Sequence, residues 1–206
     1  MNIYFDIGGT NFRYYLCNDL DIEYERLIIN RDNDIFSQIF YKLEELNKKN
    51  EIKSVTIALP GIIKNNSIYG VNNIDIKDET PLIERFNDIK IKYINDGDAY
   101  ILGISYYMNR KEPSNILGLI FGTGVGGGLI IQDKIVLNAE VHQYFEKFMK
   151  DNNLNEDNVE YVTFYLSTII KNLIMLLNLD KVVIGGYVNK VYGFKESLAS
   201  KIELSS

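Results

Sequence analysis

The sequence predicts an α/β protein built from two lobes of related topology that face each other across a cleft. Each half of the chain opens with a strand, a glycine turn and a second strand, and each later contains a helix, a strand and a terminating glycine. The 206 residues are 46% hydrophobic and 24% charged, a balance typical of a folded globular protein. We therefore expect an N-terminal lobe over residues 1–110 and a C-terminal lobe over residues 111–206, divided at the polar segment Arg110–Ser114.

In the first half, runs rich in Ile, Tyr, Phe and Leu predict strands at Asn2–Asp6, Phe12–Cys17, Ile22–Ile29, Ser54–Leu59 and Lys90–Ile94. Apolar residues recur at spacings of three and four within Ile35–Asn50, which predicts a helix. Thr80 as N-cap and Pro81 in the first turn predict a short helix that ends at Phe86. A further helix is predicted at Asp96–Asn109.

The second half starts in the same way. Strands are predicted at Ile116–Phe121, Leu129–Ile131, Ile135–Leu137 and Lys181–Ile184. A glycine loop, Gly122–Gly128, separates the first two of them. Helices are predicted at Glu140–Met149, Asn158–Leu177 and Val188–Leu204.

Composition and charge exclude several classes of function. A net charge of −6 and a pI near 4.9 leave no basic footprint for a nucleic acid. Cys17 is the one cysteine and His142 the one histidine, which excludes a zinc site built on several thiolates. No targeting segment is visible, and the apolar stretch Thr168–Leu179 is too short to span a bilayer. We expect a cytoplasmic protein that uses no zinc and binds neither nucleic acid nor a membrane.

The first candidate site is the segment from Asp6 to Asn11, with the sequence Asp-Ile-Gly-Gly-Thr-Asn. Gly8 and Gly9 let backbone N–H groups turn toward an anion without a Cβ in the way, and Thr10 adds a hydroxyl donor. Asp6, at the end of a buried strand, is suited to hold a hydrated Mg²⁺ beside phosphates. The alternative is a plain hairpin turn, for which Gly-Gly is a common signal.

The second candidate site is the loop Gly122–Gly128, which holds five of the chain's 15 glycines. A loop with this many glycines loses much conformational entropy on folding, and a plain hairpin needs only one or two glycines. Close approach of the backbone to a phosphate is therefore the better explanation for the run. The loop is neither a P-loop nor a dinucleotide fingerprint, because no Gly-Lys-Ser/Thr ends it and a strand follows it. The expected phosphate-binding residues are Gly122, Thr123, Gly124 and Gly126.

Asn95 and Asp96 stand where a strand ends and a helix begins. Asp96 is the natural general base if the reaction is phosphoryl transfer to a hydroxyl, because it would accept the hydroxyl proton as the oxygen attacks. The alternative role is that of a helix N-cap, which aspartate commonly fills.

Two further pairs are weaker signals. Glu140 and His142 could hydrogen-bond the hydroxyls of a sugar, or be surface polar residues at the start of a helix. Gly185 and Gly186 could bring a backbone turn against a base or ribose, or simply end a strand.

Together the motifs resemble the ROK family of sugar kinases, within the actin-like, hexokinase-like ATPase group. The residues that carry the resemblance are Asp6 to Thr10, Leu59-Pro60-Gly61, Asn95-Asp96, Gly122–Gly128 and Val183-Ile184-Gly185-Gly186. They come in the family's order and extend over nearly the whole chain. The resemblance implies two ribonuclease H-like lobes with mixed sheets around a nucleotide and sugar cleft.

The resemblance also implies roles for individual residues. Asp6 and the two glycine loops would bind Mg²⁺ and the phosphates of ATP, and Asp96 would be the catalytic base. The residues implied to hold the sugar are Gly61, Asn73, Asn95, Asp96, Glu140 and His142. Gly185 and Gly186 would lie at the adenosine. The family further implies a cytoplasmic homodimer that closes its lobes over the sugar.

The chain departs from the family in being shorter and in lacking the cysteine-rich zinc motif, and its Glu140–His142 segment is one residue shorter than the family's Glu-x-Gly-His. The first hypothesis is glucokinase-like, ATP-dependent phosphorylation of a hexose or N-acetylhexosamine hydroxyl with Asp96 as general base. The second is a nucleotide- or sugar-binding protein with weak or no kinase activity. The third is an ATPase acting on a non-sugar acceptor, since fold alone does not fix the substrate.

Overall fold

The computed structural model of the chain describes residues 1–8, 11–18, 21–28, 34–69, 80–108, 114–122, 124–139 and 143–202. The chain divides into two compact units, Met1–Asp96 and Gly97–Ser206. Helix α3 (Asp96–Tyr107) therefore belongs to the second unit except for its first residue. The expected lobe boundary at residue 110 lies outside the described residues and stays a prediction.

The first unit is built on a five-stranded mixed sheet with strand order β3-β2-β1-β4-β7. The strands are β1 (Asn2–Ile7), β2 (Asn11–Cys17), β3 (Ile22–Ile28), β4 (Ser54–Leu59) and β7 (Lys90–Asn95). β1, β2 and β3 form an antiparallel meander, whereas β4 and β7 run parallel to β1. All five predicted strands of this half are confirmed.

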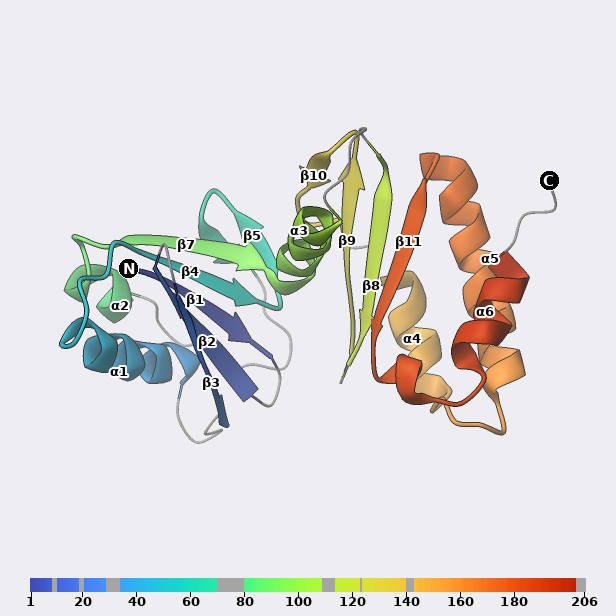
Figure 1. Cartoon of the computed structure of the whole chain (residues 1–206), viewed down its shortest axis with the longest axis horizontal. Helices are drawn as coiled ribbons and strands as arrows, with labels where there is room; N and C mark the ends of the chain where they lie inside the picture. The colour runs from blue at the N-terminus through green and yellow to red at the C-terminus, as the bar shows by residue number, and fades with distance from the viewer. Residues whose placement is uncertain are drawn as a thin grey trace. The chain divides into compact units, whose positions relative to one another are not determined.

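Alternation along β1 defines the two faces of this sheet. Ile3, Phe5 and Ile7 are at most 1% exposed and join the core under α1 (Ile35–Asn47) and α2 (Thr80–Arg85), whereas Tyr4 and Asp6 point to the opposite face. Figure 1 shows α1 and α2 on one side of the sheet. The predicted helix from Ile35 is confirmed, and it ends three residues early because residues 48–50 form a turn.

A small hairpin in the first unit was not predicted from the sequence. It consists of β5 (Ile62–Lys64) and β6 (Ser67–Tyr69), joined by Asn65 and Asn66 with φ of 51° and 58°. Left-handed conformations at both central residues define a type I′ turn, which asparagine tolerates. The side chain of Asn66 also accepts a hydrogen bond from the Tyr93 N–H at 2.9 Å, which ties the hairpin to β7.

The sheet of the second unit repeats the topology of β3, β2, β1 and β4 in the first, and the related topology of the two halves was predicted. Its sheet has the order β10-β9-β8-β11, with strands β8 (Ile116–Phe121), β9 (Val125–Ile131), β10 (Lys134–Val136) and β11 (Lys181–Gly186). β8, β9 and β10 form an antiparallel meander and β11 runs parallel to β8. Helices α4 (Gln143–Asp151), α5 (Val159–Leu177) and α6 (Phe194–Ile202) pack on one face and α3 on the other (Figure 1).

Two predictions for the second unit are wrong in detail. The glycine loop is shorter than expected, because β9 begins at Val125 and takes in the three glycines that follow. The single C-terminal helix expected over Val188–Leu204 is a 3-10 turn (Tyr187–Lys190) followed by α6. Gly193, with φ +75°, separates the two, because that backbone conformation interrupts a helix.

The helix α5 has the length and composition of a helix able to cross a membrane, and 39% of its most apolar window is buried. α5 is longer than Thr168–Leu179, the apolar stretch that was identified in the sequence. The side chains of Val162, Leu166 and Ile170 are fully buried in the core of the second unit. α5 is therefore the central helix of that core.

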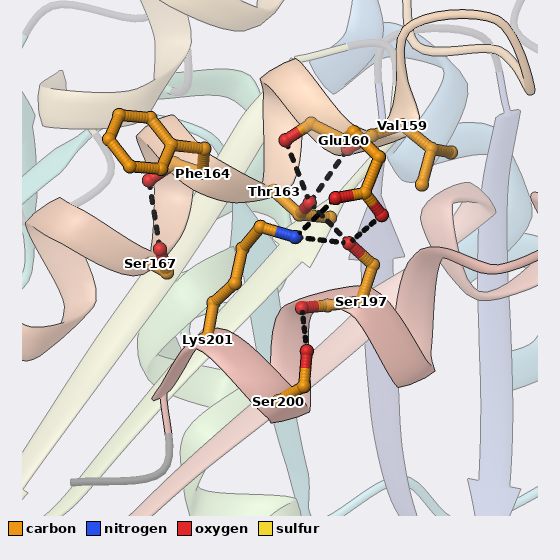
Figure 2. Close-up of polar contacts among 8 residues, drawn as sticks. All are labelled: Val159, Glu160, Thr163, Phe164, Ser167, Ser197, Ser200 and Lys201. Atoms are coloured by element: carbon orange, nitrogen blue, oxygen red, sulfur yellow. Dashed lines mark hydrogen bonds and ion pairs between the residues drawn. The ribbon is translucent and has the colours of Figure 1, made fainter. Parts of the chain in front are cut away.

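A polar cluster joins α5 to α6 (Figure 2). Lys201 Nζ lies 2.6 Å from Glu160 Oε2 and 2.7 Å from Ser197 Oγ. Ser197 in turn donates to Glu160 Oε1 and lies 2.7 Å from the buried hydroxyl of Thr163. Hydrogen bonds from Lys201 and then Ser197 lower the pKa of Glu160.

Replacing Lys201 by methionine is expected to lower the melting temperature at pH 7, and this difference should disappear in acid. A lowered folded-state pKa stabilises the fold above the ordinary value of 4.5, and that contribution is lost as the pH falls through the folded pKa. Thermal unfolding of both proteins from pH 7 to pH 3 measures the effect. Lys195→Met, at an exposed position of the same helix, is the control; a pH-independent difference for Lys201→Met would contradict the account.

Candidate functional site

Asp6 lies near the end of β1 on the face of the sheet that α1 does not cover. Arg13 is its cross-strand partner on β2, and Arg13 Nη1 donates to Asp6 Oδ2 at 2.7 Å. About two-fifths of each side chain is exposed, so the pair is open to solvent. The hydrogen bond to Asp6 raises the pKa of Arg13. The hairpin register could have revealed this pair in the sequence, but Arg13 was not singled out.

The carboxylate oxygens of Asp6 are suitable ligands for a Mg²⁺ ion that is bound together with phosphates. The described residues contain no group of three or more His, Cys, Asp or Glu side chains able to hold a metal ion. Mg²⁺ is commonly bound through one or two carboxylates, water and substrate phosphates, so a single carboxylate beside a glycine turn meets that requirement. Within the described part of the chain, Arg13 contacts one of the two carboxylate oxygens of Asp6, Oδ2.

Of the turn between β1 and β2, the structure describes the chain up to Gly8 and again from Asn11. Gly8 follows directly after β1. Gly9 and Thr10 lie outside the described residues, and of Asn11 only the backbone is described. The phosphate-binding roles of these residues therefore stay predictions.

The turn between β8 and β9 is tight, with the Gly122 N–H donating to the Gly124 carbonyl at 2.8 Å. A Cβ on Gly122 would come no closer than 4.0 Å to the Gly124 oxygen, and one on Gly124 would lie 3.5 Å from Glu146 Oε1. The described residues therefore supply no steric reason for glycine at these two positions. A ligand that approaches the backbone would supply one. Thr123 lies outside the described residues.

Other glycines of the predicted loop are explained by packing inside the fold. A Cβ on Gly126 would lie 2.9 Å from Ile120 Cγ2, and one on Gly128 would lie 2.5 Å from Ile101 Cγ2. Such contacts are too short for a real Cβ. Packing inside the fold is therefore sufficient to explain glycine at position 128, and the phosphate-binding role of Gly126 stays a prediction.

Gly185 and Gly186 also have a reason within the fold. A Cβ on Gly185 would overlap the Tyr100 hydroxyl, and one on Gly186 would overlap the Phe121 carbonyl oxygen. Gly186 has φ +98°, which few residues other than glycine adopt. Burial on the sheet raises the pKa of Tyr100. The adenosine role predicted for both glycines is not needed to explain them and stays a prediction.

The structure brings together Gly61 and Asn95, two residues predicted at the sugar. Asn95 ends β7, is 8% exposed, and donates from Nδ2 to the Gly61 carbonyl at 2.9 Å. Asp96 follows as the first residue of α3 and is partly exposed. The predicted base thus sits directly after an anchored side chain at the end of a strand. Asn73 lies outside the described residues.

Asp98 is a residue whose role sequence reasoning missed. It is 1% exposed, and its Oδ2 accepts the Asn138 N–H at 3.0 Å. Its position two residues after the predicted base was the available signal. Asn138 leads toward Glu140 and His142, which lie outside the described residues, so their sugar-binding role stays a prediction.

Comparison with known proteins places these residues in a family. The sequence profile of the ROK family matches residues 3–140, and the chain belongs to this family. It is 31% identical over 140 residues to N-acetyl-D-glucosamine kinase of Mannheimia succiniciproducens, an alignment that covers 64% of this chain and 46% of the relative. The chain thus spans about half the length of the curated relatives it matches.

Solved structures confirm the predicted actin-like fold. An inorganic polyphosphate/ATP-glucomannokinase from Arthrobacter sp. strain KM matches with a TM-score of 0.75 at 20% identity, covering 99% of this chain and 89% of that one. A ROK family glucokinase from Streptomyces griseus, in complex with glucose and AMPPNP, matches with a TM-score of 0.75 at 15% identity, covering 100% and 90%. At these identities the likeness concerns the fold.

Proposed function

We propose that the chain is a cytoplasmic, ATP-dependent sugar kinase that phosphorylates a hydroxyl of a hexose or N-acetylhexosamine. The observation that carries the proposal is the placement of Asp96 at the start of α3, directly after Asn95, which is held to the Gly61 carbonyl. The names of its relatives, N-acetyl-D-glucosamine kinase and ROK family glucokinase, support this class of acceptor.

In the proposed reaction Asp96 accepts the proton of the sugar hydroxyl as that oxygen attacks the γ-phosphorus of ATP. The bond from the γ-phosphorus to the bridging oxygen breaks, and ADP leaves. Asn95 cannot turn freely, because the Gly61 carbonyl holds its amide, so the residue directly before Asp96 keeps a fixed orientation. Ordered polar groups around Asp96 are what a general base needs to select one hydroxyl.

The nucleotide side of the proposal rests on Asp6 and on the turn at Gly122 and Gly124. A Cβ would fit at both glycines without a clash, so the proposal attributes the glycines to an approach of phosphate oxygens to the backbone. Mg²⁺ bound at Asp6 with the phosphates would neutralise charge that develops during transfer. Arg13 holds the Asp6 carboxylate in place through their 2.7 Å contact.

The experiment is coupled-enzyme detection of ADP release from Mg·ATP across a panel of hexoses and N-acetylhexosamines. Sugar-stimulated ADP release by the wild-type chain is expected, and an Asp96→Asn variant should lack it. ADP release that no sugar stimulates would contradict the proposal and favour a non-sugar acceptor. Nucleotide binding without any ADP release would favour a binding protein. Homodimer formation stays a prediction, which light scattering on the purified chain tests.

A further inference from the structure

We propose that Asp98 is a positioning residue, which fixes the backbone at Asn138 and thereby the segment leading to Glu140 and His142. The inference rests on the proposed kinase function, because it assigns to that segment a part in holding the sugar. Asp98 contacts a backbone N–H of its own chain and is not proposed to touch the substrate.

The burial of Asp98 calls for a specific reason. Among the described residues it is the one buried carboxylate, with 1% of its surface exposed. Burying a carboxylate is costly unless hydrogen bonds compensate, and an apolar side chain would pack on the sheet without that cost. The bond from the Asn138 N–H to Asp98 Oδ2, at 3.0 Å, is a compensation that also constrains the chain 40 residues away.

Asn138 is the point at which the chain changes direction after β10. Its φ is +55°, a left-handed conformation that is unfavourable for most L-residues and that asparagine tolerates. It comes two residues after the end of β10 at Val136 and two before Glu140. The bond to Asp98 therefore acts where the path toward Glu140 and His142 is set.

Asp98 is itself held rigidly by the packing of α3 on β9. A Cβ on Gly97 would overlap the Gly127 carbonyl oxygen, and one on Gly128 would lie 2.6 Å from the Gly97 oxygen. Backbone thus lies against backbone at the first turn of the helix, with no side chain between them to yield. Asp98 lies in the first turn of α3, the helix that begins at the proposed base, Asp96.

We expect Asp98→Asn to keep the hydrogen bond to the Asn138 N–H and Asp98→Ala to lose it. The Asn138 N–H needs only an acceptor, and an amide oxygen supplies one in nearly the same place. We expect Asp98→Ala to raise the KM for sugar about tenfold or more, since small misplacements of a binding segment have large effects. The KM for ATP should change less than about twofold, and Asp98→Asn should restore most of the sugar affinity.

Asn115→Ala is a matched control in the same unit. Asn115 Oδ1 accepts the N–H of Gln132, also a left-handed hairpin residue with φ 50°, at 2.8 Å. Its Nδ2 donates to the carbonyls of Leu177 and Asn178 at 3.2 and 2.9 Å. The substitution removes three hydrogen bonds within the same unit, so it should lower the melting temperature while leaving the KM for sugar unchanged.

Hydrogen exchange followed by mass spectrometry provides a readout besides activity. Peptides covering residues 137–145 should exchange faster in Asp98→Ala than in the wild type, and neither Asp98→Asn nor Asn115→Ala should show this. Unchanged exchange in Asp98→Ala overturns the anchoring role. An unchanged KM for sugar in Asp98→Ala, or an equal rise in Asn115→Ala, overturns the positioning role. A wild type that phosphorylates no sugar overturns the proposed function instead, and hydrogen exchange still decides whether Asp98 anchors Asn138.

Discussion

Replacing Asp96 by asparagine is expected to lower kcat by about 10²–10⁴, because the variant keeps the shape of the side chain but cannot accept the hydroxyl proton. The KM for ATP should change little, since Asp96 is proposed to act on the sugar hydroxyl. Steady-state kinetics with the best sugar of the panel measure both values. The variant should also keep its melting temperature, because Asp96 is partly exposed.

Asp88→Asn is the control for this variant. It makes the same chemical change at an exposed turn residue of the first unit, before β7. Its kcat should equal that of the wild type. Unchanged turnover in Asp96→Asn would remove Asp96 from the role of base, and a comparable loss in both variants would point to an effect of net charge.

The glycines around the β8–β9 turn should separate into two groups on replacement by alanine. Gly128→Ala is expected to lower the free energy of unfolding by about 1–3 kcal/mol, because its Cβ would meet Ile101 and the Gly97 carbonyl. Gly122→Ala has open space at its Cβ and should leave that free energy unchanged or slightly higher. If phosphates approach this turn, Gly122→Ala should raise the KM for ATP about tenfold, or roughly 1.4 kcal/mol.

Chemical denaturation and ATP kinetics of the two glycine variants are the measurements, and each variant is the control for the other. A stable Gly122→Ala protein with an unchanged KM for ATP would show that the turn does not meet the nucleotide. A Gly128→Ala protein of full stability would contradict the close packing of α3 on β9.

Local patterns were sufficient to predict most of the fold. The run of Ile, Tyr and Phe predicted β1, and in the structure Ile3, Phe5 and Ile7 line the core while Tyr4 and Asp6 do not. The repeated strand–glycine–strand opening predicted the common topology of the two sheets, because that sequence forms the same antiparallel hairpin in both. The family resemblance rested on the same motifs.

What the sequence did not reveal depends on contacts between distant segments. Gly128 lies in a glycine-rich run that looks like a loop, and only the approach of Ile101 explains why a strand there lacks a side chain. The bond from Asn138 to Asp98 joins residues 40 positions apart, for which no local pattern exists. The hairpin at Asn65 and Asn66 was missed for a different reason, since its strands have only three residues each.

The most direct test of the proposed sugar kinase is phosphorus NMR of the purified chain with Mg·ATP and N-acetylglucosamine or glucose. The account predicts a new phosphomonoester resonance that grows in step with ADP and is absent when Asp96 is replaced by asparagine. Inorganic phosphate appearing with ADP, without any sugar phosphate, would contradict the account and identify water as the acceptor.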